Sequence, residues 1–170
     1  MRYTRLSIAI AAIVLLLQWG DAAIVDIHLG PAIVSLDPGR EYFFIEMDEA
    51  VQDHHHSPSG DFDYTLYPAT MSFSQNRIRL ELRAMDEPIE ATPDLLLYSL
   101  LDSELAPWQM EIEDLPLDGR PGIVARGLGK MGQEANAAAF SPTDRTILLV
   151  GSDLGEEESM SLFRSIRVDA

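Results

Sequence analysis

The chain has 170 residues, and its 28 Asp and Glu residues outnumber its 12 Lys and Arg residues, giving a net charge of −16 at pH 7. A surface this acidic repels phosphate groups, so we expect no nucleic acid or anionic lipid as a partner. Cysteine is absent from the sequence, which excludes disulfides, thiolate metal ligands and thiol nucleophiles.

The first 23 residues have the order of a secretory signal peptide. Two arginines precede an apolar run over residues 6–17, and small residues close the segment. The run is shorter than the roughly 18–20 apolar residues that a membrane span needs. We therefore predict that residues 1–23 are a signal peptide. An uncleaved N-terminal anchor is the alternative, and it would be the only contact with a membrane. Both readings place residues 24–170 outside the cytoplasm, as a secreted or cell-surface protein.

Residues 24–48 are expected to form β structure. Apolar residues flank a Gly30-Pro31 break, DPGR is a turn signal, and the segment EYFFIEMD is rich in aromatic residues, as strands are. Residues 49–61, EAVQDHHHSPSGD, lose the alternation of apolar and polar residues. An irregular polar loop is expected there.

A β-hairpin is expected next along the chain. The segments DYTLYPATMSFS and RIRLELRAM are joined by Ser74-Gln75-Asn76, which is typical of a turn. In the second segment Ile78, Leu80 and Leu82 alternate with charged residues. This alternation predicts a strand with one face in water.

Two segments have the pattern of amphipathic helices. Residues 92–105 begin with a capping Thr and a Pro and continue with a stripe of leucines. Near the C-terminus, Asp153 and Glu156 have the spacing of a capping box. The side chains expected to be buried by this second helix are Met160, Phe163 and Ile166.

The predicted fold class follows from the connections. Short turns join successive strands and force antiparallel pairing, because parallel neighbours need a crossover of a dozen or more residues. The expected fold is therefore α+β, an antiparallel β-sheet with two packed α-helices, in a single domain over residues 24–170.

The segment GLGKMG, residues 127–132, matches the Gly-x-Gly-x-x-Gly pattern of dinucleotide sites. Such a site needs a helix after the glycines and further βαβ units. Only eight residues separate these glycines from Ser141-Pro142, too few for a crossover helix. We therefore predict a loop between antiparallel strands at 122–126 and 135–140, with 146–151 pairing with 135–140, and no dinucleotide cofactor.

The stretch DHHHSPSGDFD carries the strongest chemical signal. Imidazole and carboxylate groups bind zinc, copper and nickel, and His54 and His56 point the same way from an extended backbone. Asp53, Asp61 or Asp63 would complete a divalent-metal site. The alternative is an exposed polar loop without a ligand, because glycine and serine offer little preorganisation.

Catalysis finds no support in the sequence. Gly151-Ser152-Asp153 lacks the Gly-x-Ser-x-Gly elbow of serine hydrolases. The many acidic residues make any single carboxylate pair uninformative. No catalytic residue is predicted, and enzymatic activity is not expected.

The C-terminal half resembles the closing strands and helix of PsbP-like domains. The likeness lies in DLPLDGRPGIVARG, with its Asp-Gly-x-Pro-Gly turn, and in NAAAFSPTDRTILLVGSDLGEEESMSLFRSIRV, with three strands and a last helix that ends in a strand of Ser-Ile-x-Val type. The start, LGPAIVSLDPG, resembles uncharacterised exported proteins of methanogenic archaea. These resemblances imply a PsbP-like fold and a non-catalytic binding or assembly role, and they assign no functional residues.

Two functional hypotheses remain. The first is a non-enzymatic exported domain that binds a protein or cell-surface partner. The second is an extracytoplasmic divalent-metal-binding protein that uses the segment His54 to His56.

Overall fold

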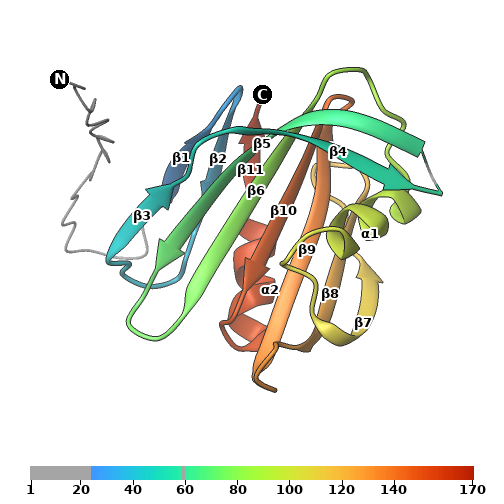
Figure 1. The fold of residues 1–170 in the computed structure, drawn as a ribbon. Coiled ribbons are helices and arrows are strands. Elements are labelled where there is room, and N and C mark those ends of the chain that lie inside the picture. Colours follow the sequence, from blue (N-terminus) through green and yellow to red (C-terminus); the bar gives the residue numbers. More distant parts are fainter. Residues whose placement is uncertain (1–23, 59) are drawn as a thin grey trace, which may run out of the picture.

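The computed structural model describes residues 24–58 and 60–170 (Figure 1), so the predicted signal peptide lies outside the described residues. The described part contains eleven strands and two helices. In chain order these are β1 (Val25–Leu29), β2 (Ala32–Leu36), β3 (Phe44–Met47), β4 (Val51–Ser57), β5 (Gly60–Ser72), β6 (Arg77–Met85), α1 (Pro93–Leu101), β7 (Trp108–Asp114), β8 (Gly122–Leu128), β9 (Glu134–Thr143), β10 (Thr146–Ser152), α2 (Glu156–Ser165) and β11 (Arg167–Asp169).

The strands form two antiparallel sheets. The large sheet has the order β3-β5-β6-β10-β9-β8-β7, and β4 also pairs with β5. Because β5 is 13 residues long, one half of it pairs with β4 and the other half with β3. The small sheet has the order β1-β2-β11.

The expected α+β fold class is wrong. Antiparallel pairing and two packed helices are present, but strands dominate the described residues and the helices have only nine and ten residues. One strand was not expected, because the segment read as an irregular loop forms β4. The chain end forms the strand β11 against β2, where the Ser-Ile-x-Val likeness implies a strand. The protein is a mostly antiparallel β fold.

Apolar side chains cover both faces of the large sheet. On one face they pack against the small sheet and α2, and on the other face they pack under α1. Strand alternation divides the central strands between these two cores. In β10, for example, Leu148 joins the first core and Leu149 the second. Neither helix in the described part of the chain has the length and apolar character needed to cross a membrane.

The first helix begins as the sequence predicts. The Thr92 side chain accepts a hydrogen bond from the backbone N–H of Leu95 at 3.2 Å, and Pro93 occupies the first turn. The capping box predicted for the second helix is wrong. The N-cap of α2 is Gly155, and no side chain caps it. The Asp153 carboxylate instead accepts the backbone N–H of Arg77 at 2.5 Å, which ties the end of β10 to β6.

Residues 129–132 of GLGKMG lie in the predicted loop between antiparallel strands, whereas Gly127 and Leu128 end β8. Strand β8 pairs with β9 in the register Gly127 to Ala135, and β10 pairs with β9 across the next turn. Both pairings confirm the predicted antiparallel arrangement of these strands, in place of the parallel crossover that a dinucleotide site needs. Of the three glycines only Gly132 has a positive φ, 79°. Gly127 serves close packing instead, because a Cβ there would lie 2.4 Å from the Trp108 carbonyl oxygen.

Candidate metal site on the β4–β5 hairpin

The histidine-rich segment lies on a hairpin that the pairing register defines. Strands β4 and β5 place His54 opposite Asp63 and His56 opposite Asp61. Directly opposed residues in an antiparallel pair share a face of the sheet, and so do residues two apart on one strand. The four side chains therefore form a compact group on one face, which we call the His–Asp cluster.

Each histidine in the His–Asp cluster contacts the aspartate opposite it. Nδ1 of His54 lies 2.9 Å from Oδ1 of Asp63, and Nδ1 of His56 lies 2.6 Å from Oδ1 of Asp61. One potential ligand atom from each of His54, His56 and Asp61 lies within 4.8 Å of the other two. All four side chains are more than half exposed to solvent, so an ion can reach them directly.

Asp53 is not brought into this group. It precedes His54 by one residue, so strand alternation turns it to the opposite face. There its Oδ2 accepts a hydrogen bond from the Tyr64 hydroxyl at 3.2 Å. Asp63, the third aspartate considered from the sequence, lies beside His54 in its place.

The middle histidine fixes the hairpin to the body of the protein. His55 is 1% exposed, and its Nδ1 contacts Oδ2 of Asp102 at 3.1 Å, just after α1. Its ring also stacks on Phe62 with a centroid separation of 6.3 Å. The same Asp102 oxygen lies 3.5 Å from a guanidinium nitrogen of Arg83, which is buried under Tyr64. The His–Asp cluster therefore lies on an anchored strand pair, which supplies the preorganisation that a glycine- and serine-containing loop would lack.

Nearby carboxylates tune the protonation of His54. The hydrogen bond that the His54 ring donates to Asp63 raises the pKa of His54 above its usual value, and the charges of Asp63, Asp61 and Asp53 add to this effect. Desolvation lowers the pKa of His54, but the side chain is exposed to water, so this effect does not outweigh that of the carboxylates. The cluster thus attracts positive charge, either a proton on His54 or a metal cation.

The donor set suits a divalent transition metal. Zinc takes histidine nitrogen and aspartate oxygen at about 2.0–2.2 Å, so tetrahedral ligand atoms lie roughly 3.4 Å apart. The ligand atoms of the cluster lie within 4.8 Å of one another, so binding an ion would require side-chain rotation to bring them closer. A carboxylate on Nδ1 leaves Nε2 of the same ring for the metal, and this arrangement commonly orients metal-binding histidines. Asp63 is placed for that role on His54.

No protein-family model, curated protein or solved structure matches this chain. The likeness to PsbP-like domains and to exported archaeal proteins therefore stays a prediction. The case for the site rests on its residues and their geometry.

Proposed function

We propose that this protein is a non-enzymatic binding protein whose ligand is a divalent transition metal ion. His54, His56 and Asp61 bind the ion, and Asp63 orients His54. The observation that carries the proposal is the cross-strand register, which gathers three potential ligand atoms within 4.8 Å on an anchored hairpin.

The electrostatics of the whole chain favour the same ligand. A net charge of −16 raises the local concentration of cations around the protein. Two imidazoles and a carboxylate select borderline metals such as zinc, copper and nickel over calcium or magnesium, which prefer oxygen ligands alone.

The proposal places the protein outside the cytoplasm. The support is the order of charges, apolar residues and small residues over positions 1–23. N-terminal sequencing of the protein recovered from its native host checks this location. A start near Ala23 supports export, whereas an intact N-terminus in a cytoplasmic fraction contradicts it.

The metal proposal is tested by titrating the full chain with Zn²⁺ in a calorimeter. We expect binding of one ion, and we expect the H54A/H56A variant to bind at least about tenfold more weakly, a loss of about 1.4 kcal/mol. The matched control is His28→Ala, which removes an exposed imidazole from β1 on the small sheet. Equal affinity in the wild type, the control and H54A/H56A would show that the hairpin is not the binding site.

A second variant separates orientation from ligation. Asp63→Asn keeps the shape of the side chain but removes the charge that holds His54. Loss of such an orienting partner typically weakens metal binding about 10–100-fold. We expect Asp63→Asn to fall in that range with the stoichiometry of one ion unchanged. An unchanged affinity would remove Asp63 from the site.

Zinc affinity is also expected to depend on pH. Metal and proton compete for the neutral imidazole. Because the pKa of His54 is raised by Asp63, this competition begins at a higher pH than for a free histidine. Affinity should therefore be lower at pH 6 than at pH 8. In Asp63→Asn the pH at which affinity falls should move down, and a pH-independent affinity would contradict binding through His54.

A further inference from the structure

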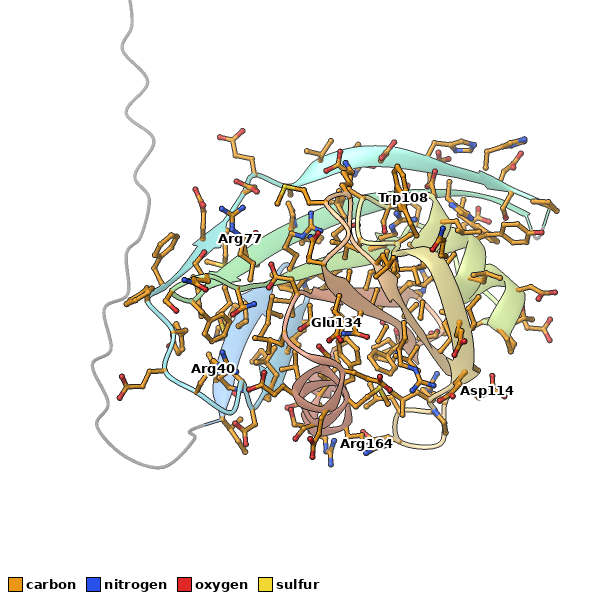
Figure 2. The ribbon with its side chains drawn as sticks, turned by 90° about the horizontal axis from the view of Figure 1, so that it is seen from below. Arg40, Arg77, Trp108, Asp114, Glu134 and Arg164 are labelled. Atoms are coloured by element: carbon orange, nitrogen blue, oxygen red, sulfur yellow. The ribbon has the colours of Figure 1, made fainter. Side chains whose placement is uncertain are left out.

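A second feature lies at the opposite end of β6 from the hairpin. A cavity of about 180 Å³ opens there on the face of the large sheet that carries α1. Its walls include Arg77 and Arg79 from β6, Lys130 from the β8–β9 loop, and Trp108 from the start of β7. Arg77 and Trp108 are labelled in Figure 2.

Small residues line part of the cavity. In the strand register Gly151 of β10 lies opposite Arg79, and Ala135 of β9 lines the same space. Gly151 has no side chain of its own, and the Leu105 side chain packs over it, since an added Cβ would lie 3.1 Å from Leu105. Leu105 also lines the cavity, so the cations lie beside an apolar residue of the core under α1.

Positive charge is concentrated in this cavity. Arg2 and Arg5 belong to the first 23 residues, so residues 24–170 carry ten of the 12 Lys and Arg residues, and three of these ten line the cavity. Lys130 is the only lysine of the chain. On a protein whose acids outnumber its bases by more than two to one, this clustering sets the cavity apart from the rest of the surface.

The three cations form no ion pair with a carboxylate among the described residues, although the charge of Arg79 acts on Glu81. Arg40, Arg83 and Arg126 form ion pairs with Asp or Glu, and the arginines outside the cavity that form none with described residues are Arg120, Arg145, Arg164 and Arg167. Two acids also line the cavity, Glu104 and Asp153, so its formal charge is positive by one.

One of the two acids, Asp153, already accepts a hydrogen bond within the protein. Oδ1 of Asp153 accepts the backbone N–H of Arg77 at 2.5 Å, and it forms no ion pair with the arginine side chains. Arg77 and Arg79 are two residues apart on one face of β6, so their positive charges repel each other. An anion bound between them relieves that repulsion.

Trp108 adds an aromatic surface to the cavity. Its side chain lines the cavity and is 62% exposed, so part of its indole remains available for contact with a ligand. An aromatic face next to guanidinium groups suits a molecule that combines an anionic group with a flat ring. The cavity volume is below the roughly 300 Å³ of pockets for drug-sized ligands, so the ligand is small.

We propose that this cavity binds a small organic anion, with its phosphate or carboxylate group held by Arg77, Arg79 and Lys130 and its ring against Trp108. Arginine side chains pair with both kinds of anion through two parallel hydrogen bonds. The site is separate from the His–Asp cluster and does not depend on a metal.

Calorimetric titration of the full chain at low salt tests the proposal with three probes: phenyl phosphate, benzoate and inorganic phosphate. We expect phenyl phosphate or benzoate to bind at least about tenfold more tightly than inorganic phosphate, and the stronger of the two identifies the anionic group. Arg79→Gln should lower the affinity for that probe at least about tenfold. Trp108→Ala should lower the affinity for that probe to the affinity for inorganic phosphate.

The matched control is Arg164→Gln, which removes the same charge from an exposed position at the end of α2. It should leave the affinity within about twofold of the wild type. Equal losses in Arg79→Gln and Arg164→Gln would mean nonspecific attraction and would overturn the proposal. Absence of measurable binding by all three probes would overturn it as well, and near-native circular dichroism of each variant excludes unfolding as the cause.

Discussion

Replacing Phe163 with alanine is expected to lower the free energy of unfolding by about 3–5 kcal/mol, the usual range for a fully buried aromatic residue. Phe163 is 0% exposed and belongs to the core between the large sheet, the small sheet and α2. Its removal takes away the contacts of a large ring and leaves a cavity that the surrounding strands cannot fill. Urea denaturation followed by circular dichroism measures the change.

Met160 provides the matched control on the same helix. The sequence predicts both residues in one buried stripe, but Met160 is only partly buried, whereas Leu162 is buried beside Phe163. Met160→Ala should therefore cost less than half as much as Phe163→Ala. Equal costs for the two variants would show that α2 buries Met160 as fully as Phe163, as the sequence predicts and the structure does not show.

The hairpins with clear turn signals were predictable because their determinants are local. Gly30 has a positive φ of 54° between β1 and β2, and the Ser74-Gln75-Asn76 turn joins β5 to β6. The antiparallel arrangement around GLGKMG was predictable for a related reason. Eight residues cannot form a crossover helix, and this limit holds whatever the rest of the chain does.

Strand β4 was missed because its determinants are distant in the sequence. Its inward-facing residue His55 is polar, so the segment lacks the apolar alternation that marks a strand. The contact that buries His55 comes from Asp102, 47 residues further along the chain. The short spacing between Ser57 and Gly60 is the local signal, because the pairing of these two residues sets the register that places His56 opposite Asp61 and His54 opposite Asp63.

The same difference between local and distant determinants separates the two candidate sites. The sequence predicts that His54 and His56 point the same way, since residues two apart on a strand share a face. The cationic cavity combines Arg77 and Arg79 with Lys130 and Trp108, whose positions depend on the order of β6, β10, β9, β8 and β7 in the sheet. No spacing in the sequence expresses that order.

Asp102→Ala should lower the free energy of unfolding by about 1–3 kcal/mol, the cost of leaving buried donors without an acceptor. Oδ2 of Asp102 contacts both His55 at 3.1 Å and Arg83 at 3.5 Å. Both partners are almost completely buried, whereas the Asp102 side chain is 44% exposed, so water replaces part of the lost interaction.

The carboxylate nearest to Arg83 after Asp102 is a poor substitute. Glu81 lies 3.9 Å from a guanidinium nitrogen of Arg83. Burial raises the pKa of Glu81, and the charges of Arg83 and Arg79 oppose this rise. Glu81 also lies farther from Arg83 than Asp102 does, so it replaces only part of the interaction that Asp102→Ala removes.

Two further variants isolate the contribution of the Asp102 contacts. Asp102→Asn keeps an oxygen that can accept one of the two hydrogen bonds, so its cost should lie between that of the wild type and that of Asp102→Ala. Glu90→Ala removes the same charge from an exposed position before α1 and should change stability by less than about 0.5 kcal/mol. If Asp102→Ala costs no more than Glu90→Ala, the buried histidine and arginine do not depend on Asp102. Anchoring of the β4–β5 hairpin would then rest on the stacking of His55 on Phe62 and on the strand pairing alone.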